Sequence, residues 1–506
     1  MRAELARPVE RARTICDRHG GLVAAGLWFL AYVLVVATGQ RFSIAYLDFG
    51  WQLVPWDILV HDPIRSVWYL HTQPPLWNLT LGCLAAVSPF SDRLTLQALQ
   101  LVIGLLLVAV LPGILRALRV GPLTAVLLAL VATLNPEVLG NAFSPTYELA
   151  VALLVALVVR TFQMVLARRD TRSLVLLACA LTALVLTRSL YHPLLIVVIL
   201  GAAMWALRHH VSRRSLAVAA AVPVLLVGGW MLKNEALYGR ATLSSWFGMN
   251  LQRSTIPILP KANLDALHAE GRVTDIATIG PFGNYGLYRD HMPPCTPTVH
   301  HPSITTEGHS LADGTIIPNF NYQCFLPVFD KAEHDFWVVA KEYPGVWLRG
   351  RWFSLKMTFA TSNLAADSHS RPFRALDAVY RFARVDAVLT ESTVDWGQPL
   401  YGRLAFPFHF SMVVVVIYAT LGVALLLALR RRWRQRLGAD LLAQGTVAVT
   451  ALLAVFTVVV GIVGELGEQA RFRSVTDPVA LSVGGVVLAR AISSWISGRA
   501  ARPADD

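Results

Sequence analysis

The stretch LLAQGTVAVTALLAVFTVVVGIVG, residues 441–464, runs directly into ELGEQARFRSVTDP, residues 465–478. The first part carries no charged side chain, and it is long enough to cross a bilayer because the hydrocarbon core takes about 20 helical residues. The second part concentrates acids and arginines and ends at a proline that opens the next apolar run. Together they predict a transmembrane helix that ends in a charged turn at one membrane face.

Similar apolar runs recur along the whole chain. Of its 506 residues, 55% are hydrophobic and only 15% are charged, and the mean hydropathy is +0.52. These values lie outside the range of soluble globular proteins and predict an all-α polytopic membrane protein. We expect about ten transmembrane helices, at residues 21–39, 96–115, 121–135, 146–163, 173–188, 192–207, 215–232, 404–429, 441–464 and 477–493. The apolar stretch 75–87 is expected to be a short helix on, or dipping into, the outer face.

The formal net charge of +12 could suggest a nucleic-acid partner. Much of the positive charge, however, lies in short loops beside apolar runs, at residues 168–169, 208–214 and 430–436. Positive residues accumulate in cytoplasmic loops of membrane proteins, so the bilayer explains the charge better than a nucleic acid does. This orientation predicts a multi-pass protein of the cytoplasmic membrane with both ends inside.

The spacing of the runs divides the chain into three parts. The first is an N-terminal transmembrane module, 1–232, with an extracytoplasmic loop at 40–95. The second is a mixed extracytoplasmic loop subdomain, 233–402, and the third comprises C-terminal transmembrane helices, 403–506, with the charged turn at 464–477.

The long loop contains Cys295 and Cys324, two of only five cysteines. Outside the cytoplasm such a pair forms a disulfide readily. It would close a loop of about 30 residues and stabilise the fold by roughly 3 kcal/mol. The alternative is two free thiols.

Ionisable side chains near the apolar runs gather at the predicted outer ends. Polar groups at a membrane are costly and usually functional, so a ring of them at one interface predicts chemistry on a lipid-borne substrate. The set comprises Asp48, His71, Glu148, Arg188, His192, Lys233, Glu465, Glu468, Arg471 and Arg473.

Four motifs lie in order on that face and carry a family resemblance. They are Tyr46-Leu47-Asp48-Phe49-Gly50, then His71-Thr72-Gln73-Pro74-Pro75-Leu76, then Trp230-Met231-Leu232-Lys233-Asn234 with Ser244 to Leu251, and finally Glu468-Gln469-Ala470-Arg471-Phe472-Arg473 with Pro478. The combination resembles the GT-C glycosyltransferases, such as protein O-mannosyltransferases and the aminoarabinose transferases that act on lipid A. The resemblance covers the membrane scaffold and is weak over 255–400. Many relatives carry a second acid after the first-loop aspartate, whereas Phe49 follows here.

The resemblance implies an inverting glycosyltransferase that moves a sugar from a polyprenyl-phosphate donor to a cell-envelope glycan, lipid or protein. Asp48 is the expected base for the acceptor hydroxyl, because a carboxylate beside a bilayer can have a raised pKa. Position alone does not separate it from Asp57 in the same loop.

Cations should hold the departing phosphate, since arginine forks suit phosphate oxygens. The candidates are Arg471, Arg473, Arg188 and Lys233, and the alternative is that they bind lipid headgroups or snorkel. Further substrate-binding candidates are Tyr46, Asp57, His71, Glu148, His192 and Glu468. Glu148 could equally be a helix N-terminal acid favoured by the dipole. Glu465 and Glu468 could simply pair with the arginines next to them.

No metal site is predicted, because the spacing of His300, His301 and His309 is too loose for zinc, although a divalent cation stays open. Two rival classes stay open as well. A transporter or lipid flippase should show ionisable residues at the membrane midplane, and a non-catalytic scaffold would not need the pattern of Asp48, Arg471 and Arg473.

Overall fold

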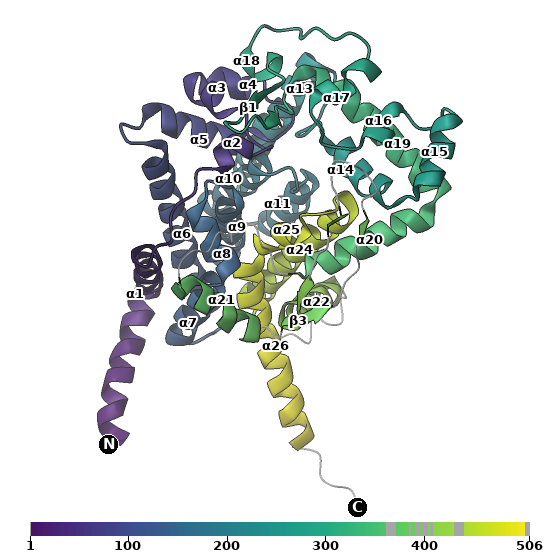
Figure 1. The fold of residues 1–506 in the computed structure, drawn as a ribbon. Coiled ribbons are helices and arrows are strands. Elements are labelled where there is room, and N and C mark those ends of the chain that lie inside the picture. Colours follow the sequence, from purple (N-terminus) through teal and green to yellow (C-terminus); the bar gives the residue numbers. More distant parts are fainter. Residues whose placement is uncertain are drawn as a thin grey trace, which may run out of the picture.

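The computed structural model describes residues 2–360, 371–383, 386–389, 394–395, 403–404, 408–429 and 440–500. The basic 430–436 cluster and residue 402, where the second predicted part ends, lie outside these ranges. The fold is almost entirely helical, and the terminal helices α1 and α26 project from the bundle in the same direction (Figure 1).

Six helices among the described residues are long and apolar enough to cross a membrane. They are Ala12–Ala37 within α1 (Arg2–Ala37), α6 (Asp92–Arg116), α9 (Glu148–Arg168), Arg213–Tyr238, α24 (Leu441–Gly464) and Asp477–Ser497 within α26 (Asp477–Ala500). Arg213–Tyr238 combines α12 (Arg213–Pro223), the π-helical turn η2 (Val224–Gly228) and α13 (Gly229–Tyr238). The predicted polytopic helical membrane fold is therefore confirmed.

One further apolar segment is bent by 63° at a break between α7 (Pro122–Thr133) and the pair α8 (Pro136–Gly140) and η1 (Asn141–Phe143), in the manner of a broken span or a re-entrant loop. The break follows from Asn135 and Pro136. The Asn135 side chain accepts a hydrogen bond from the backbone N–H of Glu137, and Pro136 starts the new helix. This restart points α8 in a new direction and buries Glu137.

The remaining predicted spans form shorter apolar helices: α10 (Thr171–Thr187), α11 (Leu194–Leu207) and α22 (Met412–Leu429). The helix predicted from 404 begins only at Met412, because residues 408–411 form strand β6 and pair with β3 instead. Helix α5 (Pro75–Val87) has 13 residues, about 20 Å at 1.5 Å per residue, which is too short to cross the core.

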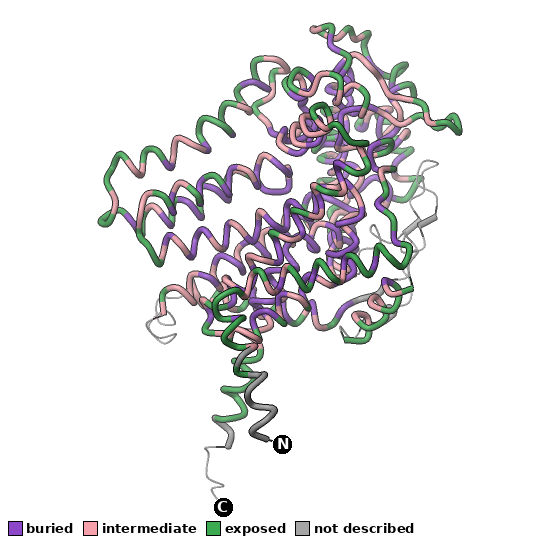
Figure 2. Tube along the Cα trace, turned by 90° about the vertical axis from the view of Figure 1, so that its left-hand side faces the viewer, coloured by how far each residue is buried: buried purple, intermediate pink, exposed green. Residues whose placement is uncertain are grey.

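The bundle packs around α9, which contacts α6, α10 and α24. Trp28 of α1 is 1% exposed and lies against Gly104 of α6, where a Cβ atom would come 2.5 Å from the indole ring. Only glycine leaves room for this contact. Figure 2 shows buried segments concentrated where helices pack side by side, with exposed segments along the outer helices.

The rest of the chain forms short elements, several of which gather at the top of Figure 1. The helices are α2 (Tyr46–Phe49), α3 (Trp56–His61), α4 (Pro63–Trp68), α14 (Phe247–Arg253), η3 (Ile256–Ile258), α15 (Lys261–Ala269), α16 (Asp275–Ile279), α17 (Tyr285–Tyr288), η4 (Arg289–His291), α18 (Pro302–Thr305), η5 (Gln323–Phe325), α19 (Leu326–Glu342), α20 (Pro344–Thr358) and α21 (Arg371–Ala383). The strands pair antiparallel in twos: β1 (Gly308–Ser310) with β2 (Ile316–Pro318), β3 (Asp386–Leu389) with β6 (Phe408–Ser411), and β4 (Val394–Asp395) with β5 (Arg403–Leu404).

An aromatic core joins the first loop to the long loop. Trp51 stacks on Phe282 with ring centroids 5.4 Å apart, and both rings contact Phe320. Nearby, Cys295 and Cys324 form the predicted disulfide, with Cα atoms 5.8 Å apart. Two loops that are distant in sequence therefore fold as one layer over the bundle.

Candidate active site

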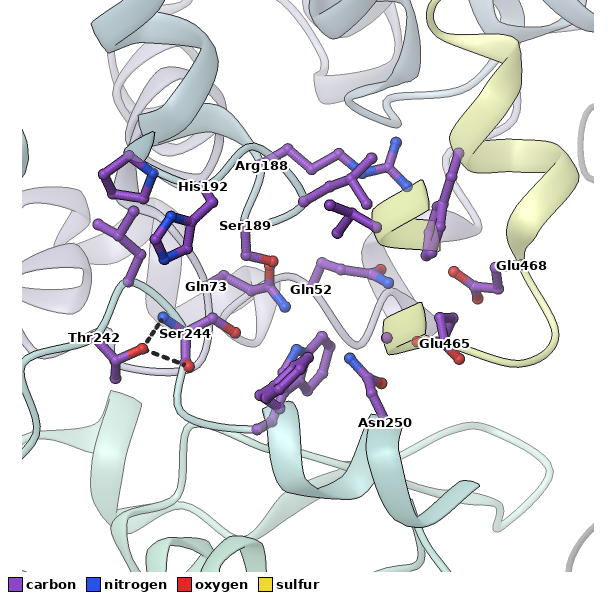
Figure 3. Close-up of a pocket in the computed structure, with 18 of the residues that line it drawn as sticks. Gln52, Gln73, Arg188, Ser189, His192, Thr242, Ser244, Asn250, Glu465 and Glu468 are labelled. Carbon is purple, nitrogen blue, oxygen red and sulfur yellow. Dashed lines mark hydrogen bonds between the residues drawn. The ribbon is translucent and has the colours of Figure 1, made fainter. Parts of the chain in front are cut away.

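A cavity of about 550 Å³ lies where four parts of the chain meet. Its walls come from the first loop, the turn between α10 and α11, the segment after α13, and the end of α24 with the charged turn that follows. Figure 3 shows the polar side chains that line it: Gln52, Gln73, Arg188, Ser189, His192, Thr242, Ser244, Asn250, Glu465 and Glu468. Apolar side chains complete the wall, among them Leu194, Met231, Phe456, Val460 and Phe472.

Arg188 is the buried cation of this wall. It follows α10, its side chain is 3% exposed, and its guanidinium lies between the rings of Tyr147 and Phe472, at 4.7 and 4.5 Å from their centroids. Within the described part of the chain, neither terminal nitrogen has a hydrogen-bond partner, and the nearest carboxylate oxygen, of Glu148, is 3.9 Å away. Buried charged donors left without partners are costly, so this group is suited to bind an anion.

Behind Arg188, a chain of ion pairs leads to the charged turn. Arg471 Nε donates a hydrogen bond to Glu148. Its Nη1 donates to Glu468 Oε2 at 3.1 Å. Glu148 therefore serves two guanidinium groups. Glu148 and Arg471 do not line the cavity themselves, but they fix the two residues that do, Arg188 and Glu468.

Tyr46 links this chain to the first loop. Its hydroxyl donates to Gln52 Oε1 at 2.7 Å, and Gln52 lines the cavity. Burial raises the pKa of Tyr46, while the nearby Arg471 guanidinium opposes that rise. The first loop and the charged turn therefore meet through Tyr46 and Arg471.

Glu465 forms the other acidic group of the wall. It is 6% exposed, and its Oε1 accepts from Arg253 Nη1 at 3.4 Å and from its neighbour's backbone N–H at 3.1 Å. Burial raises the pKa of Glu465 to about 7, against the opposing effect of Arg253. The group therefore changes protonation near neutral pH.

Among the ionisable residues that the sequence placed at the outer face, the cavity brings together Arg188, His192, Glu465 and Glu468. His192 is exposed, and its Nδ1 accepts a hydrogen bond from the Leu194 backbone at 3.2 Å. Its role, like that of every predicted site residue, stays a prediction.

Asp48 and Asp57 lie outside the cavity wall, with exposed side chains. The Asp48 carbonyl oxygen accepts a hydrogen bond from His309 Nε2 at 2.6 Å, which ties α2 to the β1–β2 hairpin. In this structure, Asp48 contributes a backbone contact between loops and no side chain to the cavity.

His71 and Lys233 form a separate clamp beside the cavity. The Lys233 ammonium donates to the carbonyl oxygens of Trp68 and Leu70, both at 2.9 Å. The His71 Nε2 donates to the Asn321 carbonyl at 3.1 Å, so Nδ1 accepts from the Ser245 hydroxyl at 2.7 Å. These contacts hold the segment that leads into Gln73, a cavity residue.

Arg473 lies in a second buried ion cluster, apart from the cavity. Its side chain is 1% exposed and pairs with Glu137 at 2.8 Å and with Asp477 at 3.2 Å. Asp477 also accepts from the Tyr418 hydroxyl at 2.7 Å. The two arginines of the charged turn therefore serve different clusters.

Several cavity residues were not singled out from the sequence, notably Gln52, Gln73, Asn250 and Arg253. Gln73 and Asn250 stand inside the quoted motifs, where neutral amides gave no chemical signal. Across the described ranges, no three His, Cys, Asp or Glu side chains are grouped so that they could hold a metal ion.

No protein-family model matches the chain, and no curated protein matches its sequence significantly. Several solved chains are similar to it, including the following two. The archaeal oligosaccharyltransferase AglB from Archaeoglobus fulgidus, solved with an inhibitory peptide and a dolichol-phosphate, matches at a TM-score of 0.41 and 11% identity, over 97% of this chain and 53% of that one. ArnT from Cupriavidus metallidurans, in the apo state, matches at a TM-score of 0.30 and 15% identity, over 92% and 78%.

The chain thus spans about half the length of AglB. Both similar proteins belong to the GT-C superfamily, which the sequence motifs resemble. At these TM-scores, the likeness assigns no activity and no residue role to this chain.

Proposed function

We propose that this protein is a membrane glycosyltransferase that takes a sugar from a polyprenyl-phosphate donor and passes it to a cell-envelope acceptor at the outer face of the cytoplasmic membrane. The observation that carries the proposal is the cavity beside Arg188, which combines buried guanidinium nitrogens that lack a hydrogen-bond partner among the described residues with a partly apolar wall.

The polar part of the proposal concerns the donor phosphate. Both terminal nitrogens of Arg188 lie buried in the cavity wall without a hydrogen-bond partner among the described residues, and the Tyr147 and Phe472 rings hold its guanidinium plane in place. A guanidinium fixed in advance stabilises negative charge as it develops on a departing phosphate, without reorganisation. Arg471 supports this arrangement through Glu148.

The apolar part concerns the lipid tail. Leu194 lines the cavity and is 57% exposed, so the apolar wall is open to the surroundings of the bundle at this residue. Met231, Phe456 and Val460 continue that wall inward. An amphiphile with one anionic group fits both halves, whereas a free polar metabolite would leave the apolar half unused.

Binding of undecaprenyl phosphate to the purified protein tests the phosphate site. Undecaprenol, which has the same tail without the phosphate, is the matched ligand. The wild type should bind the phosphate form more tightly, and Arg188→Gln should lose about 10- to 100-fold of that affinity, since a charge-assisted hydrogen bond is worth about 1.5–3 kcal/mol. Arg65→Gln, at an exposed arginine of α4, is the control. Equal binding of both ligands by the wild type would contradict the proposal.

Mass spectrometry of envelope glycans tests the transfer itself. Deletion of the gene in its native host should remove a sugar from one envelope component and leave its polyprenyl-phosphate donor unused. A transporter would instead change where the donor accumulates, and a scaffold would leave both unchanged. An unaltered glycan profile in the deletion strain would reject the transferase.

A further inference from the structure

The carboxylate of Glu465 lies in the same cavity wall as Arg188 but belongs to a different set of contacts. It follows directly after α24, at the start of the turn Gly464-Glu465-Leu466-Gly467-Glu468. Figure 3 shows it beside Glu468 and close to Asn250 at the edge of the cavity. Unlike Glu148, which is covered by Arg188 and Arg471, Glu465 is itself a lining residue.

The backbone around Glu465 is held from several directions. Its carbonyl oxygen accepts hydrogen bonds from Ser354 Oγ at 2.7 Å and from Gln469 Nε2 at 2.5 Å. Arg351 of the same α20 helix donates to the last carbonyl groups of α24. The backbone at Glu465 is therefore held by α20 and by the charged turn.

The turn is shaped to admit one arginine. Gly467 has a φ of +132°, and a Cβ atom there would lie 2.3 Å from Nη2 of Arg253. The backbone conformation favours glycine, and any larger residue would also displace the Arg253 guanidinium. The arginine that occupies this space is the one that bonds to Glu465, so the turn and α14 together present a carboxylate with a fixed cationic partner.

Three charged groups face this carboxylate, each from a different packed element: Arg253 from α14, Arg351 from α20, and Glu468 from the turn itself. Burial raises the pKa of Glu465 to about 7, Glu468 adds to the rise, and the two arginines oppose it. A carboxylate that is partly ionised at neutral pH and still basic is matched to proton abstraction.

We propose that Glu465 is the catalytic base that accepts the proton of the acceptor hydroxyl, with Arg253 as its positioning residue. This inference rests on the proposed function. In the step, the acceptor oxygen bonds to the anomeric carbon while the bond from that carbon to the phosphate oxygen breaks. The electron pair stays on the phosphate beside Arg188, and the hydroxyl proton passes to the Glu465 carboxylate, which later releases it to water.

Complementation of the deletion strain tests the assignment. Glu465→Gln should restore less than about one hundredth of the sugar transfer, because a general base contributes roughly 10²- to 10⁴-fold. Glu270→Gln, an exposed acid at the end of α15, is the matched control and should restore transfer fully. Purified Glu465→Gln should still bind undecaprenyl phosphate as the wild type does.

The pH profile separates a catalytic role from a structural one. In solubilised host membranes, wild-type transfer should fall as the pH drops through about 7. Arg253→Gln removes a positive charge that lowers the pKa of Glu465, so the acid limb should move to higher pH. Gly467→Ala, which displaces Arg253, should move it in the same direction.

The outcomes distinguish the two proposals. Two results would overturn the assignment of Glu465 and leave the proposed transferase intact. One is sugar transfer by Glu465→Gln at the wild-type rate. The other is an acid limb of the pH profile that stays at the wild-type pH in Arg253→Gln and in Gly467→Ala. A deletion strain with unchanged envelope glycans would remove the transferase, and the base with it.

Discussion

Arg471 forms a buried ion pair with Glu148, 323 residues earlier in the chain. The pair joins the charged turn after α24 to the start of α9, and Tyr46 of the first loop lies against the same guanidinium. Glu148 also lies 3.9 Å from Arg188, the cation of the cavity. Three distant parts of the sequence are therefore held together behind one binding wall.

Removal of this arginine should destabilise the protein. Arg471→Met leaves the Glu148 carboxylate buried with only the more distant Arg188, and loss of one partner from a buried pair costs about 3–5 kcal/mol. Thermal unfolding in detergent measures the effect. Arg65→Met, at an exposed arginine of α4, should change the unfolding temperature little. Equal unfolding temperatures of Arg471→Met and Arg65→Met would show that the Arg471–Glu148 pair does not stabilise the fold.

His71 should make folding stability depend on pH. Burial lowers the pKa of His71 from 6.5 to about 3, against the opposing effect of its hydrogen bond to the Asn321 carbonyl. Between about pH 6.5 and pH 3, His71 is therefore protonated in the unfolded chain and neutral in the folded chain. The free energy of unfolding decreases as the pH falls through this range. Between pH 7 and pH 5 the loss should be about 2 kcal/mol.

This pH dependence is checked by measuring the free energy of unfolding at pH 7 and at pH 5, for the wild type and for His71→Gln. The glutamine variant keeps a neutral side chain that can bond to Ser245 and Asn321, and it should lose the part of the pH dependence that is due to His71. A slope that stays the same in the variant would mean that His71 is not the source.

The disulfide should stabilise the aromatic layer over the cavity. Replacement of both Cys295 and Cys324 by serine opens a loop with a sequence separation of 29 residues, at a cost of roughly 3 kcal/mol. The unfolding temperature should fall, and reductant should lower that of the wild type but not of the variant. An unfolding temperature insensitive to both treatments would count against this role.

Asp48 and Glu465 offer competing accounts of the base. The sequence motif favours Asp48, whereas the cavity contains Glu465. Asp48→Asn keeps the backbone carbonyl that His309 contacts, so we expect a far smaller loss of sugar transfer than in Glu465→Gln. Complementation with both variants at matched protein levels decides which residue is the base. Loss of sugar transfer in Asp48→Asn, together with full transfer in Glu465→Gln, would favour Asp48.

Hydropathy predicted the helices well because membrane spans must be long and apolar. The α22 helix shows where this signal fails, since the apolar run from 404 contains a strand segment before the helix starts at Met412. The disulfide was predictable because Cys295 and Cys324 are the two cysteines of the long loop and can pair only with each other there.

Which side chains reach the cavity was harder to predict, because the motif around Asp48 and the motif around Arg471 each fold into a short helix. Residues two apart on a helix point about 200° away from each other at 3.6 residues per turn. In α2, Tyr46 faces inward and Asp48 faces out. In α25 (Gln469–Ser474), Arg471 meets Glu148 whereas Arg473 meets Glu137. From the sequence, Tyr46 and Asp48 were expected in the same site, and so were Arg471 and Arg473. The helical turn directs the two side chains of each pair to different surroundings.

The position of the donor phosphate is the most direct test of the account. A structure of the protein with bound undecaprenyl phosphate should place the phosphate oxygens within hydrogen-bonding distance of the terminal nitrogens of Arg188, with the tail leaving past Leu194. A phosphate bound instead at Lys233 or Arg473, with the cavity beside Arg188 empty, would contradict it.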